Sequence, residues 1–451
     1  MALAHHLDTH TRQALAEAWH QDSAASSLER WLDLCEQQGW GRMPENLALL
    51  TRVFGASWYF TRFIFFRGPA IADVFDSNDV SLLEADFINR HISSVDVEQE
   101  TEQALESLRI AKNEIMLRIL VAELQQSIDQ AGVEESLTTL AEATLAVALR
   151  IYSNRFAQDM EDEIGVLGMG RMAGYEMNFG SDLDLIFLYP GESTAIFEPG
   201  LRLIRALLRG IAMAAPAGSL YDVDMRLRPH GAAGVLITSD TAFEEYHSAE
   251  RDIWQRQLMT RCRPVVDGSG LAARALDRVS THIYAEYDQD ALRREVRAMR
   301  LRVENELGKP AGRYELKRGR GGVMDIDFIS HFLQLAHGAA EPGLRTASTR
   351  RALQLLHQHD LLSQGHCKQL LEGYDFLKRM EGRLRVFDMK PISTISREAT
   401  GLVSLARAMD YRGETDEEAA RILLEDYLTI ADGIRQIFDE ILPGEIVNRE
   451  S

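Results

Sequence analysis

The chain has 451 residues, and its 49 lysines and arginines against 69 aspartates and glutamates give a formal net charge of −20. A charge of this sign repels phosphate backbones and anionic membrane surfaces, so nucleic-acid and membrane binding are disfavoured. The length predicts roughly two to four domains, and the 45% apolar content, enough to fill several cores, excludes disorder.

Helical periodicity begins near residue 11 and extends to about residue 153. Its clearest stretch predicts a helix over residues 105–122, because apolar side chains recur every three or four positions. They are Leu105, Leu108, Ala111, Ile115, Ile119 and Ala122. A second helix is predicted over residues 134–151. We place a helical N-terminal domain at residues 1–125.

The character of the sequence changes between about residues 164 and 267, where short runs of Val, Ile, Leu, Tyr and Phe alternate with turn residues. Strands are predicted at residues 164–169, 182–189, 220–228, 235–238 and 261–266. Helices are predicted between them, for example at residues 201–214 and 241–247. These elements indicate an α/β domain of modest size, which we place at residues 126–288.

Helical periodicity returns near residue 289 and continues to the end of the sequence, broken by turns that contain glycine or proline. This pattern predicts a C-terminal helical bundle at residues 289–451. The predicted fold is therefore mostly α-helical, with an embedded α/β domain that holds a small mixed sheet.

The cysteines Cys35, Cys262 and Cys367 lie far apart without CxxC spacing, so neither a disulfide framework nor a thiolate zinc site is predicted. No run approaches the roughly 20 apolar residues that span a bilayer. The start of the sequence, MALAHHLDTH, lacks the basic region and apolar core of a signal peptide. These features favour a cytoplasmic location.

Residues 166–190, VLGMGRMAGYEMNFGSDLDLIFLYP, form the most informative segment. Gly168 and Gly170 follow a predicted strand, where glycine lets the backbone turn tightly and approach an anion such as a triphosphate. Asp182 and Asp184 are two residues apart at the start of the next strand, so their side chains project from one face. Because adjacent carboxylates need a compensating cation and Mg²⁺ prefers carboxylate oxygens, the segment predicts a metal site.

A further charged strand is predicted in LYDVDMRLRPHG, where Asp222, Asp224, Arg226 and Arg228 share one face. If this strand lies beside the first, Asp224 completes a three-carboxylate site, and the two arginines offer bidentate donors to phosphate. Either pattern alone is more often a solvated pair or a salt-bridged sheet face. Together with the glycine turn, the patterns resemble the nucleotidyltransferase superfold that includes DNA polymerase β.

Three segments carry a closer resemblance, to the bacterial glutamine synthetase adenylyltransferase/deadenylylase family. Residues 167–189 resemble the family's LGxGKLGGxELNFxSDLDLIFLY. Residues 223–234, VDMRLRPHGAAG, resemble its VDxRLRPxGxxG, and residues 317–328, KRGRGGVMDIDF, are similar to its KxGxGGxxDIEF. The similarity runs from about residue 105 to about residue 411. Arg171 stands where the family usually has Lys, Ala173 where it has Gly, and Asp327 where it has Glu.

The resemblance implies an enzyme that uses ATP as substrate and two Mg²⁺ ions, with Asp182, Asp184 and Asp224 as catalytic and metal-binding residues. It implies a nucleotide-binding set that consists of Gly168, Gly170, Arg171, Gly180, Ser181, Arg226 and Arg228. Glutamine synthetase is the implied protein substrate, and a PII-type signal protein is an implied partner, in the regulation of nitrogen metabolism.

Members of this family usually carry two related halves, one that attaches AMP to a tyrosine of glutamine synthetase and one that removes it by phosphorolysis. This sequence resembles a single half. Gly231–Gly234, with the sequence GAAG, and residues 292–308, LRREVRAMRLRVENELG, favour the adenylylating half.

Several alternatives stay open at this point. The chain could remove AMP by phosphorolysis to give ADP, or it could transfer another nucleotide, as a uridylyltransferase does, to another protein. It could also be a non-catalytic module that binds a nucleotide or a signal protein, although the intact carboxylates argue against this reading. Asp325 and Asp327 are either acidic residues that stabilise the start of a helix or residues beside the active site.

Overall fold

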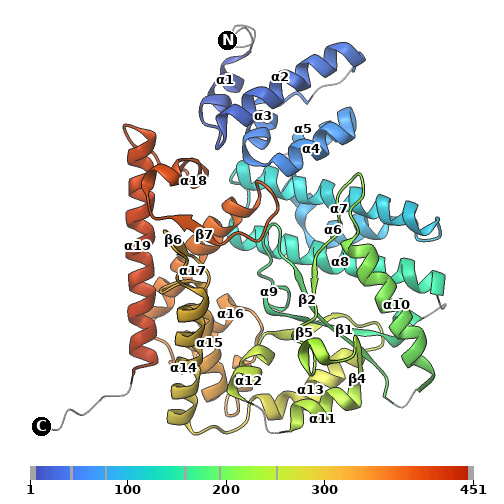
Figure 1. Cartoon of the computed structure of the whole chain (residues 1–451), viewed down its shortest axis with the longest axis vertical. Coiled ribbons are helices and arrows are strands. Elements are labelled where there is room, and N and C mark those ends of the chain that lie inside the picture. Colours follow the sequence, from blue (N-terminus) through green and yellow to red (C-terminus); the bar gives the residue numbers. More distant parts are fainter. Residues whose placement is uncertain are drawn as a thin grey trace, which may run out of the picture.

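The computed structural model describes residues 7–40, 44–76, 79–156, 160–191, 194–249 and 252–444. An N-terminal group of helices, a central sheet and a C-terminal group of helices follow one another along the chain (Figure 1). The first six residues, which belong to the segment without a signal-peptide pattern, lie outside the described residues.

Helices make up the N-terminal part of the described chain. The two helices predicted there are confirmed, and both are longer than predicted: α7 spans Thr101–Leu124 and α8 spans Gln130–Phe156. Side-chain oxygens of Asp8, Asn46 and Ser57 cap three of the shorter helices at their N-termini. These shorter helices are α1 (Thr9–Ala16), α2 (Gln21–Gln38), α3 (Leu47–Ala56), α4 (Trp58–Arg67), α5 (Ala72–Asp76) and α6 (Ala85–Ser93).

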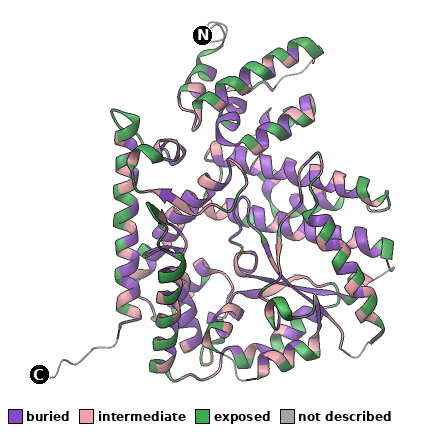
Figure 2. Ribbon diagram, in the orientation of Figure 1, coloured by how far each residue is buried: buried purple, intermediate pink, exposed green. Residues whose placement is uncertain are grey.

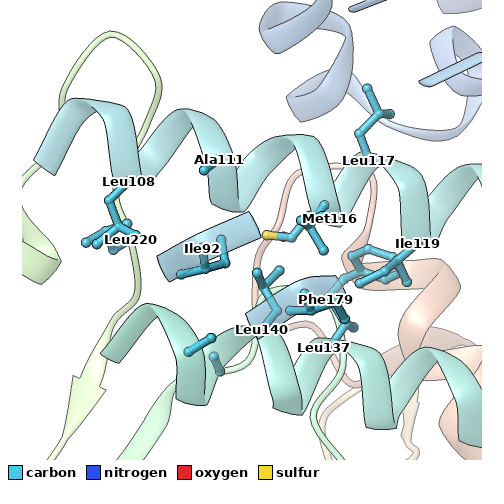
Figure 3. Close-up of a cluster of buried hydrophobic side chains, with 14 of the residues drawn as sticks. Ile92, Leu108, Ala111, Met116, Leu117, Ile119, Leu137, Leu140, Phe179 and Leu220 are labelled. Atoms are coloured by element: carbon cyan, nitrogen blue, oxygen red, sulfur yellow. The ribbon is translucent and has the colours of Figure 1, made fainter. Parts of the chain in front are cut away.

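A continuous apolar core lies between α7 and α8 (Figure 3). Leu108 and Met116 of α7 and Leu137 and Leu140 of α8 are buried in it. Phe179, which comes from the turn before the second strand, is buried in the same core. The N-terminal helices therefore support the segment that leads into the Asp182–Asp184 pair.

The central sheet is mixed and has five strands in the described chain. They are β1 (Gly165–Met169), β2 (Leu183–Tyr189), β3 (Val223–Asp224), β4 (Ile237–Ser239) and β5 (Cys262–Val266). Along the sheet the order is β3-β2-β1-β5, with β4 also paired to β2. β1 runs antiparallel to β2 and to β5, whereas β3 and β4 run parallel to β2.

The two faces of the sheet pack against different cores, and β1 and β2 are almost entirely buried (Figure 2). Leu185 and Phe187 of β2 join the core formed with the N-terminal helices. Ile186 and Leu188 join the core formed with the C-terminal helices. Because successive side chains of a strand point to opposite faces, the continuous apolar run that the sequence shows here serves both cores.

Helices surround the sheet and connect its strands. The predicted helices at residues 201–214 and 241–247 are confirmed as α10 (Thr194–Ala212) and α11 (Asp240–Ser248). The others are α9 (Gly170–Ala173), α12 (Ile253–Met259) and α13 (Leu271–Ile283). Short 3₁₀ helices occur at Gly68–Ile71, Val80–Leu83, Met160–Glu163, Gly231–Ala233, Pro342–Leu344 and Ala399–Leu402.

The helical character predicted for the C-terminal part is confirmed in the residues that the structure describes there, and the domain bounds stay a prediction. Its helices are α14 (Gln289–Leu307), α15 (Val323–His337), α16 (Thr349–Gln358), α17 (Gln364–Arg385), α18 (Val403–Ala408) and α19 (Asp416–Ile441). The sequence did not predict the antiparallel pair of β6 (Arg313–Glu315) and β7 (Thr394–Ser396), which lies within this bundle. α19 forms one edge of the molecule (Figure 1).

The strand predicted at residues 220–228 is wrong in extent, because only Val223–Asp224 pair with β2. The chain turns after Asp224, whose Oδ1 accepts the backbone N–H of Arg226 at 2.8 Å. A hydrogen bond from a side chain to the backbone two residues further along competes with the backbone hydrogen bonds that would continue the strand. Asp222, Asp224, Arg226 and Arg228 therefore do not form one strand face.

Other sequence expectations concern the whole chain. Among the described residues, no helix combines the length and the apolar character that a membrane crossing requires. Cys35, Cys262 and Cys367 are buried, and each is a free thiol. The domain boundary predicted at residue 125 falls between α7 and α8, whose side chains share one core. The boundary predicted at residue 288 directly precedes α14, which begins at residue 289.

Candidate active site

Three aspartates converge at the end of the sheet where β2 and β3 begin. Asp182 directly precedes β2, Asp184 lies in β2, and Asp224 lies in β3. Because the strands are parallel and in register, Asp184 pairs directly with Asp224. One carboxylate oxygen from each residue lies within 4.8 Å of the others. The predicted convergence of the three side chains is confirmed, and their role as metal ligands stays a prediction.

The electrostatics of this cluster differ from residue to residue. Burial, together with the neighbouring carboxylates of Asp182 and Asp224, raises the pKa of Asp184 to about 7. In contrast, hydrogen bonds from the Arg226 side chain hold the pKa of Asp224 below its usual range. The three carboxylates repel one another, and their oxygens are the ligands that Mg²⁺ prefers. The cluster therefore fits a divalent cation such as Mg²⁺.

The glycine loop, by which we mean the turn from β1 into α9, contacts this cluster through the first residue of α9. Gly170 has a positive φ of +56°, and a Cβ atom added there would lie 3.1 Å from Asp184 Oδ2. Its backbone N–H donates to the carbonyl of Arg261 at 2.9 Å. The turn therefore depends on Gly170, which has no side chain between the backbone and the carboxylate.

Gly168 lies elsewhere, and the expectation that it forms the turn is wrong. It belongs to β1, where it pairs with Leu185 of β2. A Cβ atom on Gly168 would lie 2.7 Å from Val265 Cγ1 and 3.3 Å from Met172 Cγ. Close packing between β1, β5 and α9 therefore accounts for this glycine.

We expect Gly170→Ala to weaken Mg²⁺ binding by about tenfold or more, because the added methyl strains a left-handed backbone and presses on Asp184. Gly312→Ala is the matched control, since Gly312 has a φ of +66° and no heavy atom within 4 Å of an added Cβ. Both variants should lose about 1–2 kcal/mol of stability. Calorimetric titration with Mg²⁺ and thermal unfolding measure the two effects, and equal Mg²⁺ affinity in both variants would contradict the prediction.

The turn just before β2 holds Gly180 and Ser181 beside the cluster. The Ser181 hydroxyl accepts the backbone N–H of Asn178 at 2.9 Å. Gly180 has a φ of +61°, and a Cβ atom there would lie 2.8 Å from the carbonyl of Met389. Both residues line a cavity of about 80 Å³, together with Asp222 among others. The sequence-predicted nucleotide-binding residues Gly180 and Ser181 thus line a cavity and directly precede Asp182 in the sequence.

The two predicted arginines of the 223–234 segment already have partners. The Arg226 guanidinium, 79% exposed, binds Asp224 Oδ2 at 2.5 Å. The Arg228 guanidinium donates to the carbonyls of Met225 and Gly234 at 2.6 and 2.9 Å and thereby closes the loop that follows β3. A phosphate would have to replace these partners, so the role of both arginines in nucleotide binding stays a prediction.

The C-terminal bundle supplies charged side chains that the sequence analysis missed. Arg171, which follows Gly170, donates to Glu381 Oε1 of α17 at 2.8 Å. Arg385, one turn further along α17, donates to the same oxygen at 2.8 Å. Lys317 is close enough to Arg171, Asp184 and Glu381 to change the pKa of Asp184 and of Glu381. Lys317 begins the KRGRGG segment, which was the only sequence signal for this side of the site.

Asp325 and Asp327 of this segment have different surroundings. Asp325 is fully buried within the bundle, where Arg300 Nε lies 2.5 Å from its Oδ1 and Arg435 lies 3.4 Å from its Oδ2. It also accepts the backbone N–H of Gly321 at 2.8 Å. Its contacts therefore support the structural reading, since none of them is with the three aspartates.

Asp327 is linked to the glycine loop through one residue. Its Oδ1 accepts Arg261 Nη1 at 2.9 Å, and Arg261 Nε donates to the carbonyl of Gly170 at 3.3 Å. Arg261 also forms an ion pair with the fully buried Glu176. Asp327 therefore positions the loop that contacts Asp184 without contacting the aspartates itself.

Two protein-family models match the sequence. Residues 47–278 match the family model described as glutamate-ammonia ligase adenylyltransferase, and residues 290–442 match the model described as GlnD PII-uridylyltransferase. The chain belongs to the glutamate-ammonia ligase adenylyltransferase family, whose model covers more than half of it.

Curated relatives have the name bifunctional glutamine synthetase adenylyltransferase/adenylyl-removing enzyme. The relative from Idiomarina loihiensis is 30% identical over 366 residues, which are 75% of this chain and 38% of that protein. The relative from Aromatoleum aromaticum is 30% identical over 322 residues, 68% of this chain and 34% of that protein. The relative from Chromobacterium violaceum is 29% identical over 360 residues, 77% of this chain and 40% of that protein. This chain thus spans less than half the length of these relatives.

Proposed function

We propose that this chain is a nucleotidyltransferase that moves AMP from ATP to a tyrosine of glutamine synthetase. The observation that carries the proposal is the convergence of Asp182, Asp184 and Asp224 from neighbouring strands. Membership of the glutamate-ammonia ligase adenylyltransferase family supports the choice of AMP and of the target. The proposed sheet domain is polymerase β-like, in keeping with its small mixed sheet and its carboxylates at the start of parallel strands.

In the proposed reaction, Asp182 and Asp184 would hold one Mg²⁺ ion with the triphosphate, and Asp224 would hold a second one beside the attacking oxygen. Two such ions, when bound, neutralise charge on the attacking and leaving oxygens of an in-line displacement. Asp224 is suited to its place, because the Arg226 side chain lowers its pKa and keeps it ionised near neutral pH. Asp184, with a pKa of about 7, needs a bound cation to stay ionised there.

The chemistry is a single displacement at the α-phosphorus of ATP. The tyrosine oxygen of the target forms a bond to this phosphorus, the bond to the β-phosphate oxygen breaks, and pyrophosphate leaves with the bonding electrons. The tyrosine proton is released to solvent. Gly170, whose backbone contacts Asp184, and Gly180 and Ser181, which lie beside the cavity, are the proposed nucleotide contacts.

A second candidate is the reverse type of reaction, since the curated relatives carry both activities in their names. Inorganic phosphate would then attack the phosphorus of tyrosyl-AMP, the bond to the tyrosine oxygen would break, and ADP would be released. The same three carboxylates serve either direction. The GAAG sequence at Gly231–Gly234 favours adenylylation as the first proposal.

One experiment separates the two directions. Purified chain is incubated with Mg²⁺, labelled ATP and unmodified glutamine synthetase, and separately with adenylylated glutamine synthetase and phosphate. Label in glutamine synthetase supports adenylylation, whereas ADP from the second mixture supports removal. If the Asp182→Asn/Asp184→Asn variant is as active as the wild type, or if neither mixture reacts, the proposed function is wrong.

A regulatory partner and a cellular location are also proposed, each from a single observation. The match of residues 290–442 to the PII-uridylyltransferase model supports a PII-type signal protein as a partner of the C-terminal bundle. The three buried, unpaired cysteines fit a reducing compartment, so a cytoplasmic location is proposed.

A further inference from the structure

One face of α7 holds the backbone that leads into β3. Glu106 Oε1 accepts the backbone N–H of Ala217 at 3.0 Å, and Asn113 Nδ2 donates to the carbonyl of the same residue at 2.6 Å. Between them on the helix, Arg109 Nη2 donates to the carbonyl of Gly210, in α10, at 3.2 Å. Because these positions are three or four residues apart, the side chains lie on one side of α7.

Lys112 lies on the same face and contacts three consecutive residues of this backbone. Its Nζ donates to the carbonyl of Ser219 at 3.1 Å and to that of Leu220 at 2.7 Å. It also lies 4.8 Å from the centre of the Tyr221 ring. Leu220 is buried in the apolar core formed with α7 (Figure 3). The carbonyl of the next residue, Asp222, accepts a backbone N–H at the start of β2 at 2.9 Å, so Lys112 holds the chain up to the point where it joins the sheet.

A lysine is an unfavourable residue for this place if stability alone is considered. Only 3% of Lys112 is exposed, and among the described residues its hydrogen-bond partners are the two carbonyls, without an ion pair. Burial, with Arg109 nearby, lowers the pKa of Lys112 to about 7, because a buried cation without a carboxylate is costly. A neutral amide avoids this cost, as Gln334 does where its Nε2 donates to the carbonyls of Leu344 and Thr346. The lysine therefore points to a role beyond packing.

Lys112 also lines the cavity of about 80 Å³ that lies beside the turn before β2. Ser181, which directly precedes Asp182, lines the same cavity. So does Asp222, which is two residues before Asp224. Lys112 thus lies next to both segments that carry the three aspartates, the turn that leads into β2 and the segment that leads into β3.

The short strand β3 depends on the backbone around it. Val223 and Asp224 alone pair with β2. Directly after them the chain turns, where Asp224 Oδ1 accepts the N–H of Arg226. With so few paired residues, the place of the Asp224 carboxylate also depends on the segment before the strand. This place matters, because a displacement of about 1 Å in an active site can cost about a hundredfold in rate.

We propose that Lys112 is a positioning residue, which holds residues 219–221 and thereby fixes the Asp224 carboxylate for the second metal ion. The inference rests on the proposed function, in which Asp224 holds the Mg²⁺ ion beside the attacking oxygen. In this role Lys112 touches neither the metal nor the substrate. Asn113 supports the same segment through its single bond to Ala217.

The test compares Lys112→Met, which removes the donor, with Lys112→Arg, which keeps donors at this position. Gln334→Met is the matched control, because Gln334 is 1% exposed and donates from a helix to two loop carbonyls at 2.8 Å each. Both Met variants remove two such bonds, so we expect similar falls in Tm. If Lys112→Met does not fold, Asn113→Leu takes its place, since it removes a bond to the same segment.

Binding of Mn²⁺ to the purified full chain with an ATP analogue is measured by electron paramagnetic resonance, and Mg²⁺-ATP binding by calorimetry. Lys112→Met should weaken the second Mn²⁺ ion by about tenfold or more, because the residues that orient a metal ligand contribute this much to metal affinity. Mg²⁺-ATP affinity should change by less than about twofold, since Asp182 and Asp184 keep their own support.

AMP transfer to glutamine synthetase gives an independent readout. For Lys112→Met, kcat should fall about tenfold at low Mg²⁺ and recover in part at high Mg²⁺, because added ion refills a weakened site. Lys112→Arg should recover much of the loss. Gln334→Met should keep the Mn²⁺ affinity and the Mg²⁺ dependence of the wild type.

Three results overturn the role of Lys112: a second Mn²⁺ ion bound equally well by Lys112→Met, equal weakening in Gln334→Met, or a wild type that binds a single ion. The proposed function fails in a different way. If the second ion depends on Lys112 while the wild type neither adds AMP nor removes it, the positioning stands and the proposed reaction is wrong. If AMP transfer occurs and Lys112→Met keeps the Mg²⁺ dependence of the wild type, the reaction stands and the positioning is wrong.

Discussion

Replacing Asp182 and Asp184 together by Asn is expected to lower the rate of AMP transfer on the order of a thousandfold or more, because metal-assisted displacement at phosphorus contributes several kcal/mol of transition-state stabilisation. Asp182 and Asp184 supply two of the three carboxylates of the cluster. Asp277→Asn on α13 removes one carboxylate charge at an exposed position outside the cluster and should transfer AMP like the wild type. The measurement is transfer of labelled AMP to glutamine synthetase under saturating Mg²⁺.

The same double variant should be more stable than the wild type without Mg²⁺. Asp184 has a folded-state pKa of about 7 against a usual value of 3.8. Above pH 4 the unfolded chain ionises this group while the folded chain keeps it protonated, so the stability of the wild type falls between about pH 4 and pH 7. The variant lacks this loss and should gain about 2–4 kcal/mol relative to the wild type at pH 8.

Thermal or urea unfolding of both proteins across this pH range, with and without Mg²⁺, measures the effect. Added Mg²⁺ should raise the stability of the wild type at pH 8 and leave the double variant unchanged, because the ion binds the folded carboxylates. A variant that is less stable than the wild type in Mg²⁺-free buffer at pH 8 would contradict the electrostatic account of the cluster.

Replacing Arg261 by Met is expected to cost about 3–5 kcal/mol of stability, because it leaves a buried carboxylate without its cation. Glu176 is fully buried and pairs with Arg261, which also donates to Asp327 Oδ1 at 2.9 Å. The carbonyl of Gly170 loses a donor as well, so AMP transfer should fall together with stability. Urea unfolding and the transfer assay measure the two effects.

A second substitution distinguishes an unpaired charge from lost packing. Glu176→Gln added to Arg261→Met should restore part of the stability, since it removes the uncompensated charge and leaves an amide oxygen for the Tyr374 hydroxyl. Arg320→Met is the control, because Arg320 is 54% exposed and its ion pair with Asp432 should contribute less than about 1 kcal/mol. If Arg261→Met and Arg320→Met lose the same stability, the buried contacts of Arg261 with Glu176 and Asp327 do not stabilise the glycine loop.

The sequence predicted the centre of the site because the relevant pattern is local. Asp182 and Asp184 share a strand face through their spacing, and the apolar run after them could only be a buried strand. Placing Asp224 beside them required the further assumption that two strands are neighbours, and the parallel pairing of Asp184 with Asp224 confirms it.

Where prediction failed, the cause was a contact that spacing does not show. The strand at residues 220–228 ends early because the Asp224 side chain bonds the N–H of Arg226. Gly168 is a glycine because β1 packs closely on Val265. The alternation of polar and apolar residues in the sequence shows neither of these contacts.

The cationic side of the site comes from residues more than 130 positions away in sequence, since Lys317 and Glu381 lie near Arg171 only in the folded chain. Asp325 and Asp327 show the same limit within one helix. Two residues apart in a helix, they point in different directions, one toward Arg300 and the other toward Arg261. In the sequence both stand near the start of the predicted helix, which could not tell them apart, and only Asp325 lies in the first turn of α15.

Carboxylates from two neighbouring strands are proposed to bind divalent cations that hold a nucleotide. Anomalous diffraction from crystals grown with Mn²⁺ and a non-hydrolysable ATP analogue tests it most directly. Mn²⁺ peaks are expected in direct coordination with Asp182, Asp184 and Asp224 and with phosphate oxygens of the analogue. Analogue bound elsewhere, or peaks that leave Asp224 without a metal contact, would contradict it.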